Sequence, residues 1–166
     1  MTDRLTLLGT AEWTHWSRIG TSHVLTASGA PALAPSGAAV NLPFDFRDGW
    51  FYSAGLEYVL APSWTLRAGI GYELTPVTDQ VRIPLLPDNN RTWFAGGLTN
   101  RLTDSLSLDV AFSYVAFKNT PLNVVPGNPW FNTVTYVGTA NSSINLLSIG
   151  VRYRVAPPPA PVVTKG

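Results

Sequence analysis

The chain has 166 residues, of which 45% are hydrophobic and 13% charged, with a formal net charge of +1 and no cysteine. This length fits one domain, and the lack of cysteine excludes a disulfide framework and thiolate chemistry. The nearly balanced charge, without a cluster of Lys or Arg, gives no reason to expect a nucleic-acid partner. No run approaches the roughly 18 consecutive apolar residues of a transmembrane helix, so the apolar residues are interleaved with polar ones.

The first half of the chain predicts three β-strands, because apolar and polar residues alternate along them with a period of two. The first strand is expected over 5–19, and a loop rich in Ala, Pro, Ser and Gly follows over 20–48. Two further strands, 49–60 and 63–74, are joined by a short turn at Pro62. These two strands are expected to form a hairpin.

The second half of the chain repeats this arrangement with three more strands. A long connection over 75–91 contains three prolines, which do not fit central strands, and the strands 92–102 and 106–114 come next. A third long loop over 118–143 leads into the last strand, 144–155. Transmembrane barrels have short periplasmic turns and longer extracellular loops. The regular alternation of long and short connections therefore predicts a membrane barrel whose two termini are periplasmic.

The strand 63–74 indicates what the two faces of the sheet contact. Trp64 and Ile70 lie on one face, whereas Arg67 and Gly69 lie on the other. A polar face of small residues suits the lumen of a barrel, an apolar face suits lipid, and the length fits the roughly 9–11 residues of a tilted membrane strand. We therefore predict an all-β fold, an antiparallel transmembrane β-barrel of the outer membrane, to which this chain contributes about six strands.

Pairing across the first short turn places two charged residues of the lumen face side by side. With a turn of three residues, Leu60 lies opposite Trp64, and the same register sets Glu57 opposite Arg67. Directly opposite charges on one face of an antiparallel pair attract each other. The first hairpin is therefore expected to hold an ion pair inside the barrel.

The equivalent count in the second hairpin places Thr99 opposite Asp109, with Arg101 on the diagonal and within reach of Asp109. The last strand adds an arginine on the same face. The predicted lumen charge network consists of Glu57, Arg67, Arg101, Asp109 and Arg152. We interpret these residues as ion pairs that stabilise the barrel wall, and contact with a solute is the alternative.

Several short motifs are shared with a known family. They are the runs 64–69 (WTLRAG), 75–77 (TPV) and 87–91 (PDNNR), together with Arg82, Trp93 and the strand LSLDVAFSY. Through them the segment 58–117 resembles the FadL/TodX family of outer-membrane transporters of hydrophobic compounds, and 11–17 shows a weaker likeness. The resemblance implies a fourteen-stranded barrel with an N-terminal plug. Such a barrel takes up long-chain fatty acids or aromatic hydrocarbons and releases them through an opening in its wall.

With about six predicted strands, the chain is expected to match the C-terminal part of this family pattern. The plug, the early strands and the wall opening would then lie upstream of Met1, and the N-terminus shows no export signal with a cleavage site. A six-stranded sheet leaves two open edges in lipid, where each unsatisfied backbone group costs several kcal/mol. The expectation is therefore a portion of a longer barrel, with a non-functional truncated fragment as the alternative.

The end of the last strand resembles the insertion signal of outer-membrane proteins, a pattern of polar, Gly, aromatic and hydrophobic positions over 148–155. This resemblance implies that the outer-membrane assembly machinery contacts Gly150, Tyr153 and Val155. We assign 1–155 to the barrel. The remaining residues, 156–166, are expected to form a Pro-rich, disordered periplasmic tail, since prolines favour extended chain.

The second long loop carries the candidate contacts for a ligand. Arg82 and Arg91 would favour a fatty-acid carboxylate that enters at the mouth of the barrel. The alternative, which we favour, is that they pair with Asp79 or Asp88 and order the loop. Apolar residues between the two arginines offer a surface to an alkyl chain or, alternatively, form a small core of the loop; they include Leu85 and Leu86.

No motif for catalysis, metal binding or a nucleotide occurs, and His15 and His23 are the two histidines of the chain. The sequence therefore predicts neither an enzyme nor a cofactor. It predicts passive transport of hydrophobic small molecules by a protein embedded in the lipid bilayer of the outer membrane. Two other classes stay open: a structural or adhesive outer-membrane barrel without transport, and a soluble β-sandwich or lipocalin-like binding module.

Overall fold

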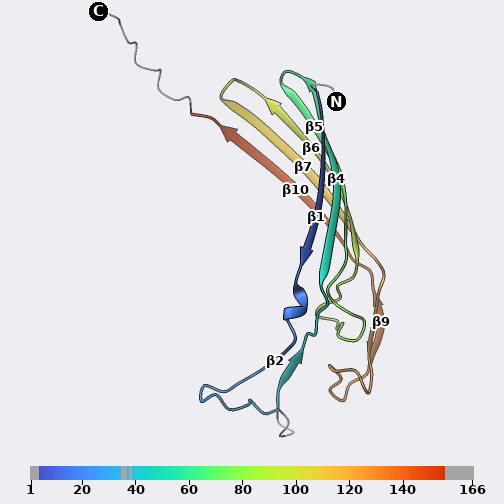
Figure 1. Ribbon diagram of the computed structural model, residues 1–166. Helices are drawn as coiled ribbons and strands as arrows, with labels where there is room; N and C mark the ends of the chain where they lie inside the picture. Colours follow the sequence, from blue (N-terminus) through green and yellow to red (C-terminus); the bar gives the residue numbers. More distant parts are fainter. Residues whose placement is uncertain (1–3, 35–36, 38, 156–166) are drawn as a thin grey trace, which may run out of the picture.

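A computed structural model describes residues 4–34, 37 and 39–155 of the chain. Within them, six strands form one antiparallel sheet in the order β1-β4-β5-β6-β7-β10 (Figure 1). The bounds of these strands are β1 Leu5–Thr14, β4 Gly49–Ala61, β5 Trp64–Glu73, β6 Arg91–Arg101, β7 Leu106–Phe117 and β10 Ser143–Tyr153. The long and short connections alternate as the sequence predicts. The predicted tail, 156–166, lies outside the described residues.

The smaller elements lie in the long connections at one end of the sheet. The first connection holds the 3-10 helix η1 (Trp16–Arg18) and the hairpin of β2 (Thr21–His23) with β3 (Asn41–Pro43). The third holds the hairpin of β8 (Thr120–Val124) with β9 (Tyr136–Ala140). Helix η1 has three residues, and in the described part of the chain no helix is long and apolar enough to cross a membrane.

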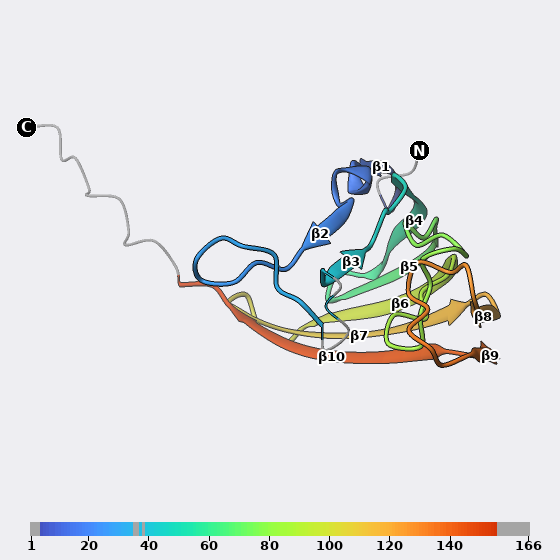
Figure 2. The ribbon, with the colours of Figure 1, turned by 90° about the horizontal axis from the view of Figure 1, so that it is seen from below.

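The six strands follow one another around an arc (Figure 2). The register places residues of one kind in continuous rows across this arc. One row contains an apolar residue from each strand: Leu5, Tyr58, Leu66, Leu98, Val110 and Ile149. In β4 the apolar residues are exposed and the alternate residues are less accessible, as expected for the outer and inner faces of a curved sheet. The outer, convex face is therefore apolar.

Two details of the predicted strands are wrong. The first strand ends at Thr14 rather than at Ile19, because its partner β4 begins at Gly49, opposite Thr14, and the ladder has no further residue to pair with. Leu60 does not lie opposite Trp64, because an irregularity after Val59 brings Ala61 to that place. Beyond this bulge the predicted register holds, and Glu57 lies opposite Arg67.

The buried core lies mainly in the connections. The buried hydrophobic side chains of the described residues are Val77, Val81, Val115, Leu122 and Val124. All but Val115 belong to the second long connection or to β8, and Val115 stands near the end of β7 that faces them. The second and third long connections therefore fold against each other as a small globular unit at one end of the sheet. We call this unit the loop cluster (residues 75–90 and 118–142).

Candidate functional site

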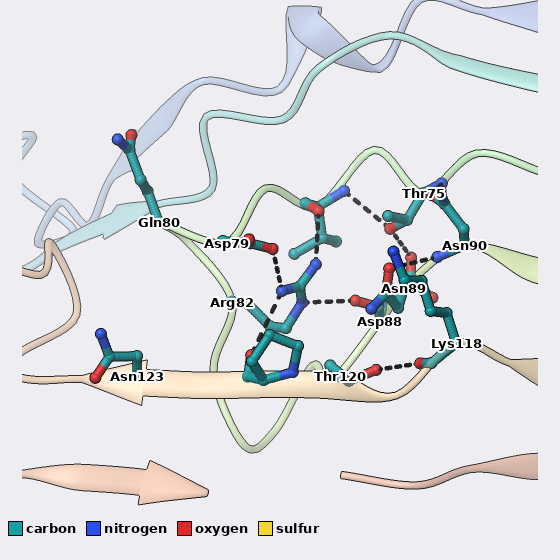
Figure 3. Close-up of polar contacts among 12 residues, drawn as sticks. Thr75, Asp79, Gln80, Arg82, Asp88, Asn89, Asn90, Lys118, Thr120 and Asn123 are labelled. Atoms are coloured by element: carbon teal, nitrogen blue, oxygen red, sulfur yellow. Dashed lines mark hydrogen bonds and ion pairs between the residues drawn. The ribbon is translucent and has the colours of Figure 1, made fainter. Parts of the chain in front are cut away.

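Arg82 lies at the centre of the loop cluster and is 2% exposed (Figure 3). Its Nε donates to the backbone oxygen of Asp88 at 2.7 Å, and Nη2 donates to that of Val77 at 3.3 Å. Its Nη1 donates to the carboxylate of Asp79 and, at 3.4 Å, to the backbone oxygen of Pro121 in β8. One buried guanidinium thus holds the turns of the second connection and joins them to the third.

Further polar contacts hold the same segment at both ends. Thr75 donates through its hydroxyl to Asp88 and through its backbone N–H to Oδ1 of Asn90 at 3.0 Å. The side-chain amide of Asn89 donates to the backbone oxygen of Asn119 at 2.9 Å. These contacts close the segment 75–90 into a loop that rests on the third connection. The sequence indicates them only through the resemblance, since TPV and PDNNR are among the shared motifs.

Arg91 begins β6 and lies on the inner face at the loop end of the sheet. Its Nη2 donates to Oε1 of Glu73 at 2.6 Å, and Nη1 lies 3.3 Å from Oδ1 of Asp88. Its guanidinium carbon lies 5.2 Å from the ring centroid of Phe117, and Trp93 donates to Oε2 of Glu73 at 3.1 Å. For Arg82 and Arg91 alike, the observed contacts are those of the loop-ordering alternative, and the role at the mouth stays a prediction.

Leu85 stands at the tip of a tight turn and is 92% exposed. The turn is closed by the backbone N–H of Leu86, which donates to the oxygen of Ile83 at 3.0 Å. Leu86 is also exposed, so the pair does not form a core of its own. The exposed Leu85 therefore lies at the tip of a loop whose backbone is fixed by hydrogen bonds from the buried Arg82.

On the inner face near the short turns, polar side chains form a chain that crosses the sheet. Nε of Arg67 donates to Oε2 of Glu57 at 2.7 Å, and its Nη1 donates to Oγ1 of Thr99 at 2.6 Å. Thr99 donates to Oδ1 of Asp109, and Nη2 of Arg152 lies 3.4 Å from Oδ2 of Asp109. Every strand from β4 to β10 in the sheet takes part. The predicted pairings of Glu57 with Arg67 and of Thr99 with Asp109 are confirmed.

Arg101 does not join this chain, and the predicted contact with Asp109 does not form. Arg101 lies in register with Ser107 on β7, and Arg152 lies in register with Ser107 from the other side. The Asp109 carboxylate instead accepts from Thr99 at Oδ1 and from Arg152 at Oδ2. The sequence gives the face of each charge but does not decide which arginine takes the carboxylate.

Between the polar chain and Arg91, the inner face is apolar and has small side chains. Two adjoining recesses of about 280 and 350 Å3 share Leu8, Gly55, Gly69 and Ala95 in their walls. Among the residues that the structure describes, no three His, Asp or Glu side chains converge to hold a metal ion. The inner face therefore offers apolar contact flanked by fixed charges.

Comparison with known proteins agrees with this arrangement. Residues 1–155 match the family described as outer membrane protein transport protein (OMPP1/FadL/TodX). The chain belongs to this family. FadL/TodX proteins are outer-membrane transport proteins rather than a class of enzymes, and the chain is accordingly a partial transmembrane β-barrel of the outer membrane.

Individual members of the FadL/TodX family show how much of the barrel is present. Outer membrane protein P1 of Haemophilus influenzae is 28% identical over 157 residues, which cover 92% of this chain and 32% of that protein. A long-chain fatty acid transport protein of Escherichia coli O6:H1 (strain CFT073) is 37% identical over 70 residues, 42% of this chain and 16% of that protein. A crystal structure of a Pseudomonas aeruginosa FadL homologue matches with a TM-score of 0.78 and 28% identity, covering 92% of this chain and 33% of that one. The chain thus spans about a third of the length of outer membrane protein P1 and of the Pseudomonas aeruginosa FadL homologue.

Proposed function

We propose that the protein takes part in passive uptake of hydrophobic solutes, such as long-chain fatty acids or aromatic hydrocarbons, across the outer membrane. The observation that carries this proposal is the apolar stretch of the inner face around Gly69 and Ala95, which lies between fixed charges at both ends. Ligand sites combine apolar walls with a few placed polar groups. A water-filled pore for ions or sugars would not need such a stretch. The transport names of the relatives support the same solute class.

At the outer end, we assign the first contact with the solute to Leu85 and Leu86, with Arg91 at the entrance to the inner face. An exposed leucine on a loop in water is unfavourable by itself, and covering it with an alkyl chain removes apolar surface from water. Arg91 would attract a carboxylate, although Glu73 and Asp88 partly neutralise it. Arg82 serves this site indirectly, because it fixes the loop that presents Leu85.

The proposal is tested by uptake of labelled oleate in a strain that lacks its own long-chain fatty acid transporter. The full protein, as its gene encodes it, is expected to raise uptake above that of cells without it. Leu85→Asp should lower the initial rate about threefold or more, since it replaces an apolar contact of about 1 kcal/mol by a charge. Leu25→Asp is the matched control, because Leu25 is an exposed leucine of the first connection. No uptake by protein shown to be in the membrane contradicts the proposal.

Assembly into the membrane is a further expectation. We propose that the outer-membrane assembly machinery contacts the end of β10 at Gly150, Tyr153 and Val155. Tyr153 at the end of β10 and Val155, two residues beyond it, are exposed, and β10 is an edge strand of the described sheet. An edge presents unpaired backbone groups that another strand can pair with. Tyr153→Ala should therefore reduce the amount of protein in the outer membrane, with Tyr136→Ala in β9 as the control.

A second candidate is an adhesive barrel, which the loop cluster favours. A cavity of about 680 Å3 lies between the second and third connections and is lined by Asp79, Gln80, Asn123 and Asn128. Pro121, Val125, Pro126 and Pro129 also line it, so the cavity would suit a surface ligand that has both polar and apolar groups. Cells that bind a surface through this protein, yet take up no oleate, would favour the adhesive function.

A further inference from the structure

A cavity of about 240 Å3 lies on the inner face beside the two short turns. Its walls include four arginines, Arg67, Arg101, Arg152 and Arg154, and one acidic residue, Asp104. The register explains the crowding: Arg101 and Arg152 lie on either side of Ser107. Arg154 follows two positions after Arg152 and donates its backbone N–H to the oxygen of Ser105, 2.7 Å away.

The carboxylates of the sheet neutralise two of the four arginines of this cluster. Glu57 pairs with Arg67 at 2.7 Å, and Asp109 lies 3.4 Å from Arg152. Within 4–34, 37 and 39–155, no ion pair involves Arg101 or Arg154. Like charges on neighbouring strands destabilise a sheet. An arrangement of this kind is favourable when an anion binds between the arginines.

The neighbouring surface indicates what is attached to that anion. Arg67 lines the arginine cavity and also the apolar recess of about 280 Å3 that contains Gly69 and Ala95. A charged site and an apolar site therefore adjoin on one continuous face. This layout fits an amphiphile that has an anionic head at the short turns and a chain directed toward the loops. A guanidinium binds a carboxylate through two parallel N–H donors.

We propose that Arg101, Arg152 and Arg154 bind the carboxylate of a long-chain acid whose alkyl chain lies in the apolar recess. The proposal rests on the proposed uptake of hydrophobic solutes and adds the orientation of the solute and the residues that hold its head group. Arg101 and Arg154, which form no ion pair with a described residue, thereby gain a role that differs from stabilising the barrel wall.

The test compares two probes of equal chain length, laurate and the neutral 1-dodecanol. Uptake above the level of cells without the protein is measured for the wild type and for the double variant Arg101→Gln/Arg154→Gln. At limiting concentration, laurate uptake by the double variant should fall about tenfold, because the charge-assisted hydrogen bonds from Arg101 and Arg154 to the carboxylate are lost. Dodecanol has no carboxylate, so its uptake should change less than about twofold. Arg18→Gln, at an exposed arginine of η1, should affect neither probe.

Folding and function are separated by two further comparisons. Arg101→Lys/Arg154→Lys keeps both charges and should restore a large part of laurate uptake, with the amount of membrane protein unchanged. Loss of both probes in the Gln variant, or unchanged uptake of both, overturns the arginine site while the proposed function stands. If the wild type takes up neither probe, the proposed function itself fails.

Discussion

The sheet and the loop cluster differ in whether their apolar side chains are covered by other parts of the protein. In the sheet, apolar side chains of the convex face stay uncovered, and Ile70 in the middle of β5 is 51% exposed. In the loop cluster, Val77 and Leu122 are buried although the segments that carry them are rich in polar residues and Pro. Lipid solvates the outer face of a barrel, so this face needs no protein cover. Loops stand in water and must bury their own apolar residues.

The two regions also differ in how they use an arginine. Arg67 on the inner face pairs with Glu57 while both side chains are about one third or more exposed, and exposed pairs contribute little to stability. Arg82 is fully buried and donates to three backbone oxygens, those of Val77 and Asp88 in the second connection and that of Pro121 in β8. Removal of a buried donor leaves acceptors without partners, which costs more than the hydrogen bond itself contributes. The loop cluster should therefore be sensitive to the loss of Arg82, whereas the sheet should tolerate the loss of Arg67.

The largest effect is expected from Arg82→Met. The oxygens of Val77, Asp88 and Pro121 lose their donor, and we expect the loop cluster to open at a cost of about 4 kcal/mol. External protease should cut within 75–90 in intact cells. The sheet should keep its resistance to unfolding in SDS without boiling, since the cluster is attached only at its end.

Arg18→Met provides the control for this variant, because Arg18 lies in η1 of the first connection and is exposed. This variant makes the same change of Arg to Met without breaking a buried contact. Equal protease resistance of Arg82→Met and the wild type would mean that the loops do not depend on the buried arginine. Unfolding of the whole sheet in Arg82→Met would mean that the stability of the sheet depends on the loop cluster.

The second prediction concerns the faces of the sheet. Ile70→Arg places a charge on the lipid face and should destabilise the barrel by about 2–4 kcal/mol at the midplane. Ser113→Arg, on the inner face between Ala95 and Leu146, should cost much less. Unfolding in urea, followed by tryptophan fluorescence in lipid vesicles, measures both. Equal costs would contradict the assignment of the two faces.

A smaller effect is expected where the inner face is crowded. At Gly71, an added Cβ would lie 2.9 Å from the Cε2 and Cζ atoms of Phe51, whereas at Gly69 the nearest atom would be the backbone oxygen of Ala54 at 3.5 Å. Gly71→Ala should therefore destabilise by about 1 kcal/mol, because the ring must move. Gly69→Ala should be tolerated in the same urea experiment. If Gly69→Ala costs as much, the crowding is not local to Phe51.

The strands can be predicted from the sequence, because lipid on the outer face and water on the inner face impose an alternation of apolar and polar residues. Alternation between lipid and lumen predicts β4 to β7 with ends that differ by a residue or a few, and short turns then fix most of the register. The bulge after Val59 leaves no mark in the alternation. The hairpin of β8 with β9 is also missed, since β8 has five residues and contains Pro121.

The site follows from the sequence less well. The sequence places Arg82 in a polar loop and favours its pairing with Asp79 or Asp88, but it does not indicate the burial of Arg82 or its contact with Pro121, 39 positions away. Packing between two loops cannot be deduced from the period of either loop. The faces of Arg101 and Arg152 are predictable, but the choice of Asp109 between them depends on side-chain geometry. Sequence thus gives the location of charges and structure gives their partners.

The smallest expected effect lies where the sheet meets the first connection, at Asp48. Hydrogen bonds from Ser17, first its side chain and then its backbone N–H, lower the pKa of this carboxyl below its ordinary value of 3.8, and His15 adds a weaker attraction. The N–H of Ser17 lies 3.0 Å from Oδ1 of Asp48 and holds η1 in place. Because the pKa is lowered on folding, the stabilisation is fully present above pH 3.8 and is lost as the pH falls through the lower, folded value.

Hydrogen exchange of the segment 15–20 measures this effect when the wild type is compared with Asp48→Asn at each pH, so that the intrinsic pH dependence cancels. The wild type should be better protected at pH 6, and the difference should vanish toward pH 2. Asp104→Asn, on a short turn at the other end of the sheet, should leave this segment unchanged. A constant difference at all pH values would show that η1 is held by packing, as the loop cluster is, rather than by the charge of Asp48.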